Sequence, residues 1–253
     1  MLASLVAVLL LLGGMLAGGD DRPAEQTAVA ETETAPSGPP TPYFASYRSL
    51  RLSLPVPPDK VTVVAFHQAA GKRALHLEPL VPIADMEAVA KRVNDGDFVT
   101  SAQLAEENGS ASDASSIWDG EALQLWRSGR TGPPDTAVDV GALPGTEVRS
   151  PVSGKVIAVR PYDLYGSVQD FEIHIQPDGW PEVDVVLIHV TDVLVSEGET
   201  VVGGVTRIAS VRALAREIGP LQISGYVADE GDHVHVQLNE LPDPAMMEYI
   251  GDS

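Results

Sequence analysis

The pattern of apolar and polar residues changes several times along this chain. Residues 2–17 are almost wholly apolar, a run that is too short for a confident membrane span and is typical of a signal-peptide core. Residues 20–42 are rich in Pro, Thr, Ala and Glu with almost nothing to bury, and they predict a disordered spacer. Regular patterning begins at Tyr43 and continues to about residue 240, where we expect the folded part of the protein.

Residues 43–130 predict a small α+β or β module followed by a loop. Two histidines, His67 and His76, lie in its apolar, strand-like segments. We interpret them as half-buried rings bonded to the backbone, because they could reach a site further along the chain only if this module packs across it. The strand-like segments are 49–56, 61–66 and 74–77, with a short helix over 85–93 and a polar stretch over 94–116.

After Arg130 the chain changes to short apolar segments separated by turn signals such as Leu143-Pro144-Gly145 and Glu197-Gly198. Many short strands with regular turns favour an all-β barrel or sandwich, which we place at residues 131–240, with a tail over 241–253. Strands are expected at Val148–Arg149, Lys155–Val159, Phe171–Ile175, Val183–His189, Val193–Val195, Val205–Val211 and His233–Leu238, and a possible short helix at Arg212–Ile218.

Charge and composition restrict the partners. The chain has 36 acidic and 16 basic residues and a net charge of −20. Such a field opposes binding to nucleic acid or to an anionic bilayer and fits cationic substrates, metal ions or a merely solvated acidic surface better. The absence of cysteine excludes disulfides, a thiolate metal site and a cysteine nucleophile.

The apolar N-terminus predicts export from the cytoplasm. The small residues before Asp20 suit cleavage after Gly19, so residues 1–19 are interpreted as a signal peptide, with an uncleaved membrane anchor as the alternative. Gly19 also stands where a lipoprotein signal needs cysteine, which excludes lipidation. We therefore expect an extracellular or cell-envelope protein that contacts the membrane only through this segment.

His233 and His235 form a His-x-His pair in a segment with strand-like alternation. Residues two apart on a strand lie on one face, roughly 7 Å apart along it. Two such imidazoles can share a metal ion and its bound water, although surface strands also carry solvated histidines.

The motifs after residue 130 follow one another in a particular order. They are Asp135-Thr-Ala-Val-Asp139, Leu143-Pro-Gly-Thr-Glu-Val, Pro151-Val-Ser-Gly-Lys-Val, the strand-ending His189, Val195-Ser-Glu-Gly-Glu-Thr-Val and His233-Val-His235. This succession resembles the lysostaphin-type (LytM-like) peptidoglycan zinc metalloendopeptidase family over about residues 131–240. The resemblance implies an antiparallel β barrel-like sandwich of the duplicated-hybrid-motif type. It also implies a zinc ion in a groove and cleavage of peptide cross-links in bacterial peptidoglycan.

The resemblance implies a role for each of five residues. Asp139 and His235 become metal ligands, His233 the base that acts on metal-bound water, and His189 an auxiliary group that stabilises the oxyanion. The first ligand, a histidine in the family, is Asp135 here. With a second carboxylate the ion loses net charge, so its water, which needs a pKa of about 7, becomes a poorer acid. The preference also moves from Zn²⁺ towards Mn²⁺, Mg²⁺ or Ca²⁺, or to no metal at all.

Two functions therefore stay open. The first is an exported metalloendopeptidase that hydrolyses peptidoglycan peptides. The second is a catalytically degenerate member that binds peptidoglycan or regulates another wall hydrolase. A third reading, a lipoyl-type carrier domain around Lys155, is disfavoured because that lysine lies within a strand and not at the tip of a hairpin.

Overall fold

The computed structural model describes residues 39–71, 73–95, 120–166 and 168–242. The predicted leader (1–19), most of the predicted spacer (20–42) and nearly all of the tail lie outside these ranges. In the described ranges, no helix combines the length and the apolar character needed to cross a membrane. The last residues of the predicted spacer contact the fold: the backbone N–H of Thr41 donates to Gly204 O (3.0 Å), and its hydroxyl donates to Leu54 O (2.6 Å).

The largest sheet in the described part of the chain has eight strands, in the order β12-β8-β9-β10-β14-β6-β3-β5. They pair antiparallel except β3 and β5. The predicted, mostly β fold is confirmed, but this sheet is open and does not close into a barrel. Its strands are β3 (Val63–His67), β5 (Leu123–Gln124), β6 (Ala137–Gly141), β8 (Gly154–Leu164), β9 (Val168–Pro177), β10 (Val183–Ile188), β12 (Thr200–Val201) and β14 (His233–Glu240).

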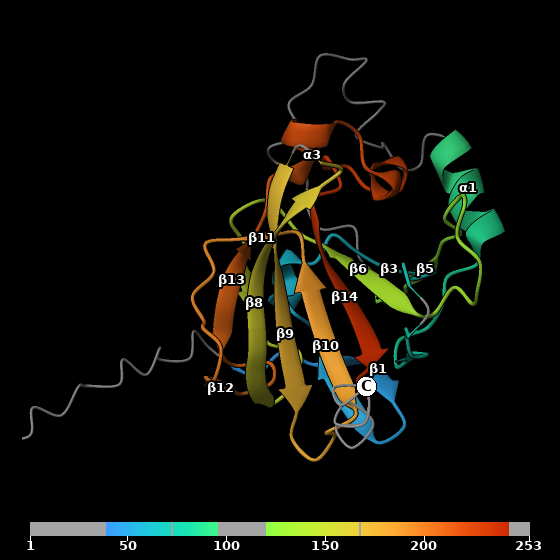
Figure 1. Cartoon of the computed structure of the whole chain (residues 1–253). Helices are drawn as coiled ribbons and strands as arrows, with labels where there is room; N and C mark the ends of the chain where they lie inside the picture. The colour runs from blue at the N-terminus through green and yellow to red at the C-terminus, as the bar shows by residue number, and fades with distance from the viewer. Residues whose placement is uncertain (1–38, 72, 96–119, 167, 243–253) are drawn as a thin grey trace, which may run out of the picture. The chain divides into compact units, whose positions relative to one another are not determined.

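Smaller sheets and short helices complete the described fold (Figure 1). One sheet contains β2 (Leu50–Ser53), β1 (Tyr43–Tyr47) and β4 (Glu78–Pro79), and another contains β11 (Val190–Thr191), β13 (Arg207–Val211) and β7 (Glu147–Arg149). The helices are α1 (Met86–Asp95), α3 (Leu214–Ile218), η1 (Pro58–Lys60) and η3 (Gln222–Gly225).

The two predicted helices are confirmed, and two predicted strands, at 74–77 and 193–195, are wrong. Ala74 forms only an isolated bridge, and residues 75–77 are irregular. The N-terminus of α1 is stabilised by Asp85, whose carboxylate accepts the backbone N–H of Glu87 at 2.9 Å. The short helix expected after Val211 is α3. Residues 193–195, expected as a strand, are irregular, although the backbone N–H of Leu194 still bonds to Ile208 O (2.8 Å).

The large sheet contains strands from both sides of residue 130, where the sequence analysis places a domain boundary. β3 pairs with β6, with Ala65 opposite Asp139, and β5 pairs with β3. The rings of Phe44 and Phe66 lie 6.5 Å apart within a core that also includes Val138 from β6. The N-terminal segment therefore supplies both a central part of the core and a strand, β3, next to β6, the strand that carries Asp139.

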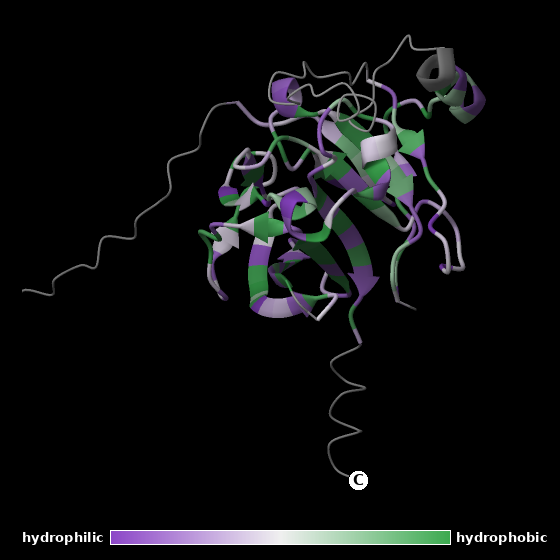
Figure 2. Cartoon of the chain, turned by 90° about the horizontal axis from the view of Figure 1, so that it is seen from above, coloured by the Kyte–Doolittle hydropathy of each residue, from purple (hydrophilic) through white to green (hydrophobic). Residues whose placement is uncertain are grey.

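Alternation along the central strands separates the core from the site. On β14, Val234, Val236 and Leu238 are fully buried in the core, while His233 and His235 point to the opposite face. Figure 2 shows this change between hydrophobic and hydrophilic residues along the strands. The period-two pattern that predicted this strand is thus the pattern that aims both imidazoles away from the core.

Candidate metal centre

Three adjacent strands bring His67, Asp139 and His235 together. The register places Asp139 on β6 directly opposite His235 on β14, and His67 on β3 opposite Ala137, two residues along β6. One ligand atom from each side chain lies within 4.8 Å of the others, and no other group of this kind is found among the described residues. The group is buried: His67 and Asp139 are 0% exposed and His235 is 7% exposed.

The carboxylate of Asp139 is the centre of this group. Its Oδ1 lies 3.0 Å from His67 Nε2 and 2.8 Å from His235 Nδ1. Burial alone would raise the pKa of Asp139, but interactions with His233, His67 and His235 outweigh burial and hold that pKa well below its usual range. The carboxylate is therefore ionised at neutral pH and available as a ligand.

A backbone hydrogen bond determines which nitrogen of His67 faces Asp139. His67 Nδ1 lies 2.8 Å from the carbonyl oxygen of Gln68, an atom that can only accept, so Nδ1 carries the proton. Nε2 is then the ring atom that faces the Asp139 carboxylate. A bond from the other ring nitrogen to a backbone carbonyl is a common way in which proteins orient metal-binding histidines.

The guanidinium of Arg127 supplies positive charge at one side of the group. Arg127 Nη2 donates to Asp139 Oδ2 and lies 3.4 Å from His67 Nε2. The backbone of Arg127 is held by its N–H bond to Gln68 Oε1 (2.9 Å), whereas its side chain is 23% exposed. The arginine reaches the group from its solvent edge and is not enclosed within it.

The donor atoms fit a zinc ion. Two imidazole nitrogens and one carboxylate oxygen are a common ligand set for catalytic Zn²⁺, and such sites leave a fourth position open. With two neutral imidazoles and one carboxylate, bound Zn²⁺ keeps a net charge near +1. The weakening expected from a second carboxylate does not apply to this set.

His233 lies beside the group and faces it with an unprotonated nitrogen. Its Nδ1 donates to Gly231 O at 2.8 Å, so the lone pair is on Nε2, which lies 3.6 Å from Asp139 Oδ2. Nε2 is buried and has no hydrogen-bond partner among the described residues. Burial lowers the pKa of both His233 and His235 to about 4, so both rings are neutral at pH 7.

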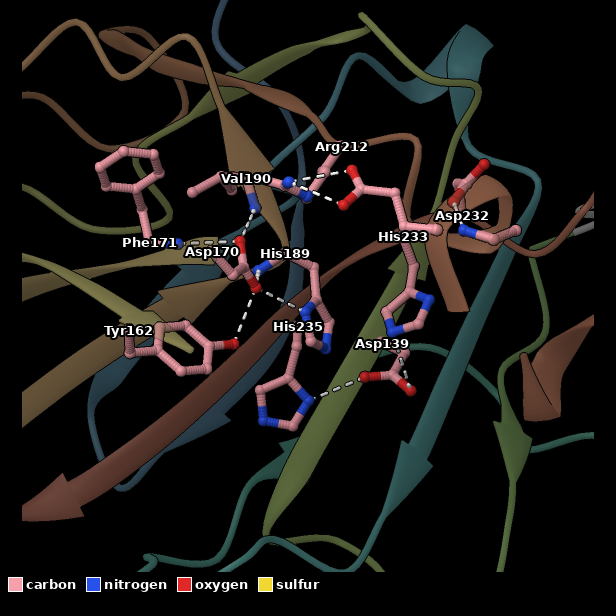
Figure 3. A network of polar contacts seen from close by, with 12 residues as sticks. Asp139, Tyr162, Asp170, Phe171, His189, Val190, Arg212, Asp232, His233 and His235 are labelled. Atoms are coloured by element: carbon pink, nitrogen blue, oxygen red, sulfur yellow. Dashed lines mark hydrogen bonds and ion pairs between the residues drawn. The ribbon is translucent and has the colours of Figure 1, made fainter. Parts of the chain in front are cut away.

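His189 completes a cluster of imidazoles. It follows the last residue of β10, and its ring centre lies 5.1 Å from that of His233 and 6.1 Å from that of His235. Its Nδ1 lies 2.9 Å from Asp170 Oδ2. Figure 3 shows Asp170 on one side of the His189 ring and the rings of His233 and His235 on the other.

Four of the five predicted site residues gather here, and Asp135 does not. His67, and not Asp135, joins Asp139 and His235 in the group that could hold a metal ion. Asp135 lies two residues before β6, where its backbone C=O accepts the N–H of Leu77 (2.7 Å). Its carboxylate instead meets His76 Nδ1 at 3.1 Å.

The remaining histidines lie outside the cluster. His76 is largely exposed and does not lie in a regular strand, so its interpretation as a half-buried strand residue is wrong. His174 lies on β9 between the buried Ile173 and Ile175, and its Nδ1 is 2.8 Å from Asp184. His67 is the candidate ligand that the sequence alone did not indicate. The only available signal was a histidine directly after the apolar run Val63–Phe66.

No protein-family model and no curated protein sequence matches this chain.

Proposed function

We propose that this protein is a metal-dependent hydrolase of peptide bonds, with His67, Asp139 and His235 as the metal ligands. One observation carries the proposal: the bond from His67 Nδ1 to Gln68 O directs Nε2 at the buried Asp139 carboxylate, beside His235. Two imidazoles and an ionised carboxylate that converge in a buried place are the donor set of a cation site.

A bound Zn²⁺ would lower the pKa of a water molecule and polarise a substrate carbonyl group. His233 is placed to act as the base, because its Nε2 is unprotonated, faces Asp139 and makes no other hydrogen bond among the described residues. His233 takes a proton from the attacking water as the water oxygen bonds to the carbonyl carbon. The carbonyl–nitrogen bond then breaks, and the proton passes from His233 to the departing amine, which leaves a free carboxyl group and an amine. His189 stabilises the oxyanion from the other side of the cluster.

The substrate class and the location rest on the sequence. The order of motifs over residues 131–240 supports peptidoglycan peptides as the substrate and a fold of the duplicated-hybrid-motif type. The apolar residues 2–17 support export to the cell envelope. Both belong to this proposal, as does membership of the LytM-like family.

The experiment is metal analysis of the purified full chain, combined with release of soluble fragments from peptidoglycan. We expect one zinc per chain, loss of hydrolysis after chelation, and recovery when zinc is restored. Asp139→Asn and His235→Ala should lose both zinc and hydrolysis, whereas His76→Ala, which removes an exposed histidine, should keep both. A chain that takes up no stoichiometric metal and leaves peptidoglycan intact with every divalent ion tried would refute the proposal.

A second candidate, the non-catalytic member, is favoured by one contact. Arg127 already pairs with Asp139, and a permanently bound guanidinium would neutralise the carboxylate without any metal. The protein would then bind peptidoglycan or regulate a hydrolase. Metal-free protein that sediments with peptidoglycan, together with unchanged cell behaviour for His233→Ala, would favour this candidate over hydrolysis.

A further inference from the structure

We propose that Asp170, assisted by Tyr162, is the positioning residue that determines which nitrogen of His189 exchanges protons with the site. The inference rests on the proposed function, because that function assigns His189 the role of stabilising the oxyanion beside the metal ligands. Asp170 has no place in the motifs that carry the family resemblance, and only the fold brings it to His189.

The carboxylate of Asp170 is fully buried and accepts hydrogen bonds at both oxygens. Oδ2 accepts from His189 Nδ1 (2.9 Å), from the His189 backbone N–H (2.9 Å) and from the Tyr162 hydroxyl (2.7 Å). Oδ1 accepts from the backbone N–H groups of Phe171 (2.9 Å) and Val190 (3.2 Å). Figure 3 shows this arrangement around Asp170.

These bonds hold a strained turn. His189 lies between β10 and β11 with a φ of 66°, in the left-handed region that non-glycine residues seldom adopt. Asp170 bonds the backbone N–H groups of both His189 and Val190, the two residues at the bend. Backbone conformations of this kind persist where surrounding contacts enforce them, and they are concentrated at functional sites.

The same carboxylate determines the tautomer of His189. Burial alone would raise the pKa of Asp170, but its hydrogen bonds, first of all with His189, outweigh burial and lower that pKa, so the group is an acceptor at neutral pH. His189 Nδ1 must then carry its proton, and Nε2 is the ring atom left to exchange protons. Nε2 can accept from water and, once protonated, donate to an oxyanion while Asp170 balances the charge of the imidazolium.

Tyr162 supports Asp170 from the neighbouring strand. The two residues are register partners in the β8–β9 pair, and the Tyr162 hydroxyl reaches Oδ2. Burial, followed by the bond to Asp170, raises the pKa of Tyr162, so the hydroxyl stays protonated and acts as a donor. Tyr162 therefore orients the carboxylate but does not determine the tautomer of His189.

Asp170→Asn is a sharp test because the amide must replace one acceptor oxygen by a donor. An NH₂ group at the Oδ1 position would face two backbone N–H donors, Phe171 and Val190. At the Oδ2 position it would face one backbone donor, that of His189, while the imidazole and the tyrosine hydroxyl can rearrange to accept. The amide should therefore choose Oδ2 and force His189 into the Nε2–H tautomer.

The main readout is the ¹⁵N chemical shifts of the His189 ring in the full chain. Zinc titration and peptidoglycan hydrolysis are measured separately, to give zinc affinity and turnover. In the wild type we expect Nδ1 protonated and Nε2 unprotonated, with the two reversed in Asp170→Asn. Turnover should fall by about 100-fold or more, the size of a lost proton-transfer group, while zinc affinity stays within about threefold. Asp184→Asn alters another buried carboxylate paired with a histidine, His174, and should change neither the shifts nor the turnover.

Several results would overturn the inference. One is a wild-type spectrum in which His189 carries its proton on Nε2. This result does not depend on whether any variant folds. Another is an Asp170→Asn protein with normal turnover, and a third is loss of zinc together with activity, which would make Asp170 a support of the metal centre. If the wild type hydrolyses nothing, the proposed function fails, but the tautomer measurement still decides the role of Asp170.

Discussion

Arg127 donates from its guanidinium to the carboxylate of Asp139, the same group that His67 and His235 face. The contact places a protein cation at the edge of a candidate cation site. Two positive charges about 4 Å apart repel by about 4 kcal/mol near a protein surface. A divalent ion bound by Asp139 must therefore displace the guanidinium, and the partly exposed side chain of Arg127 can move into solvent.

Arg127→Gln should increase metal affinity. Removing the guanidinium removes a competitor for Asp139 and a repelling charge, so the dissociation constant for Zn²⁺ should fall by about tenfold or more, which corresponds to about 1.4 kcal/mol. Isothermal titration of the full chain with zinc measures the change. Arg160→Gln, which removes an exposed arginine on β8, provides the matched control for net charge.

The competition between Arg127 and a metal ion for Asp139 has a second consequence, which separates the hydrolase from the non-catalytic candidate. If Arg127 permanently replaces the metal, Arg127→Gln should unfold at a lower temperature without metal, because a buried carboxylate loses its partner. Unchanged zinc affinity in Arg127→Gln would show that the guanidinium does not compete, and would contradict the first prediction.

His67→Ala should abolish zinc binding, whereas Asp135→Asn should leave it intact. His67 offers Nε2 beside Asp139, while Asp135 bonds to the exposed His76. Losing a residue that only hydrogen-bonds to a metal ligand already lowers metal affinity by about 10- to 100-fold. Losing one of the three ligands themselves should lower zinc affinity by at least as much, enough to empty the site. Zinc content after gel filtration gives the comparison, and the reverse result would restore Asp135 as the ligand.

Local pattern was enough to predict the strand that carries His233 and His235, because alternation with a period of two places residues on opposite faces of a strand. The family resemblance, and not local alternation, led us to expect Asp139 at the site, and on β6 Asp139 does lie opposite His235. Short helices after Val211 and over Met86–Asp95 also follow from local sequence.

The third candidate ligand, His67, depends on which strands are neighbours, and local sequence pattern does not indicate that pairing. His67 reaches Asp139 only because β3 lies beside β6, a pairing between segments far apart in the chain. Asp170 reaches His189 for a similar reason, since β9 lies beside β10. The exposure of His76 likewise depends on tertiary contacts that override the apolar character of its neighbours.

His174 should stabilise the protein in a pH-dependent way. Its hydrogen bond with Asp184, first among the causes, raises the pKa of His174 above the value in an unfolded chain. The stabilisation is therefore complete below about pH 6.5, the unfolded pKa, and is lost as the pH rises through the higher folded pKa. In urea unfolding with chelator present, the wild type should exceed His174→Gln by about 1 kcal/mol or more at pH 5.5, and by less at pH 9.

His76→Gln is the control for this titration, because His76 is largely exposed and its partner Asp135 is also partly exposed. Exposed pairs contribute little, so this variant should match the wild type within about 0.5 kcal/mol at both pH values. A His174→Gln deficit that stayed constant or grew from pH 5.5 to pH 9 would contradict the assignment of the stabilisation to the charged His174–Asp184 pair.

Phe66→Ala should destabilise the whole described fold and not only its N-terminal segment. Phe66 is fully buried, packs near Phe44 and belongs to the same core as Val138 and Val236. Removing a buried phenylalanine costs about 3–5 kcal/mol, while Tyr43→Ala, at a 53% exposed position, should cost less than about 1 kcal/mol. Because β3 lies inside the sheet, paired with both β6 and β5, we expect a single unfolding transition that shifts as a unit in circular dichroism and tryptophan fluorescence. Two separate transitions, with only the first moved by Phe66→Ala, would instead show that residues 43–130 fold independently of the strands that carry Asp139, His233 and His235.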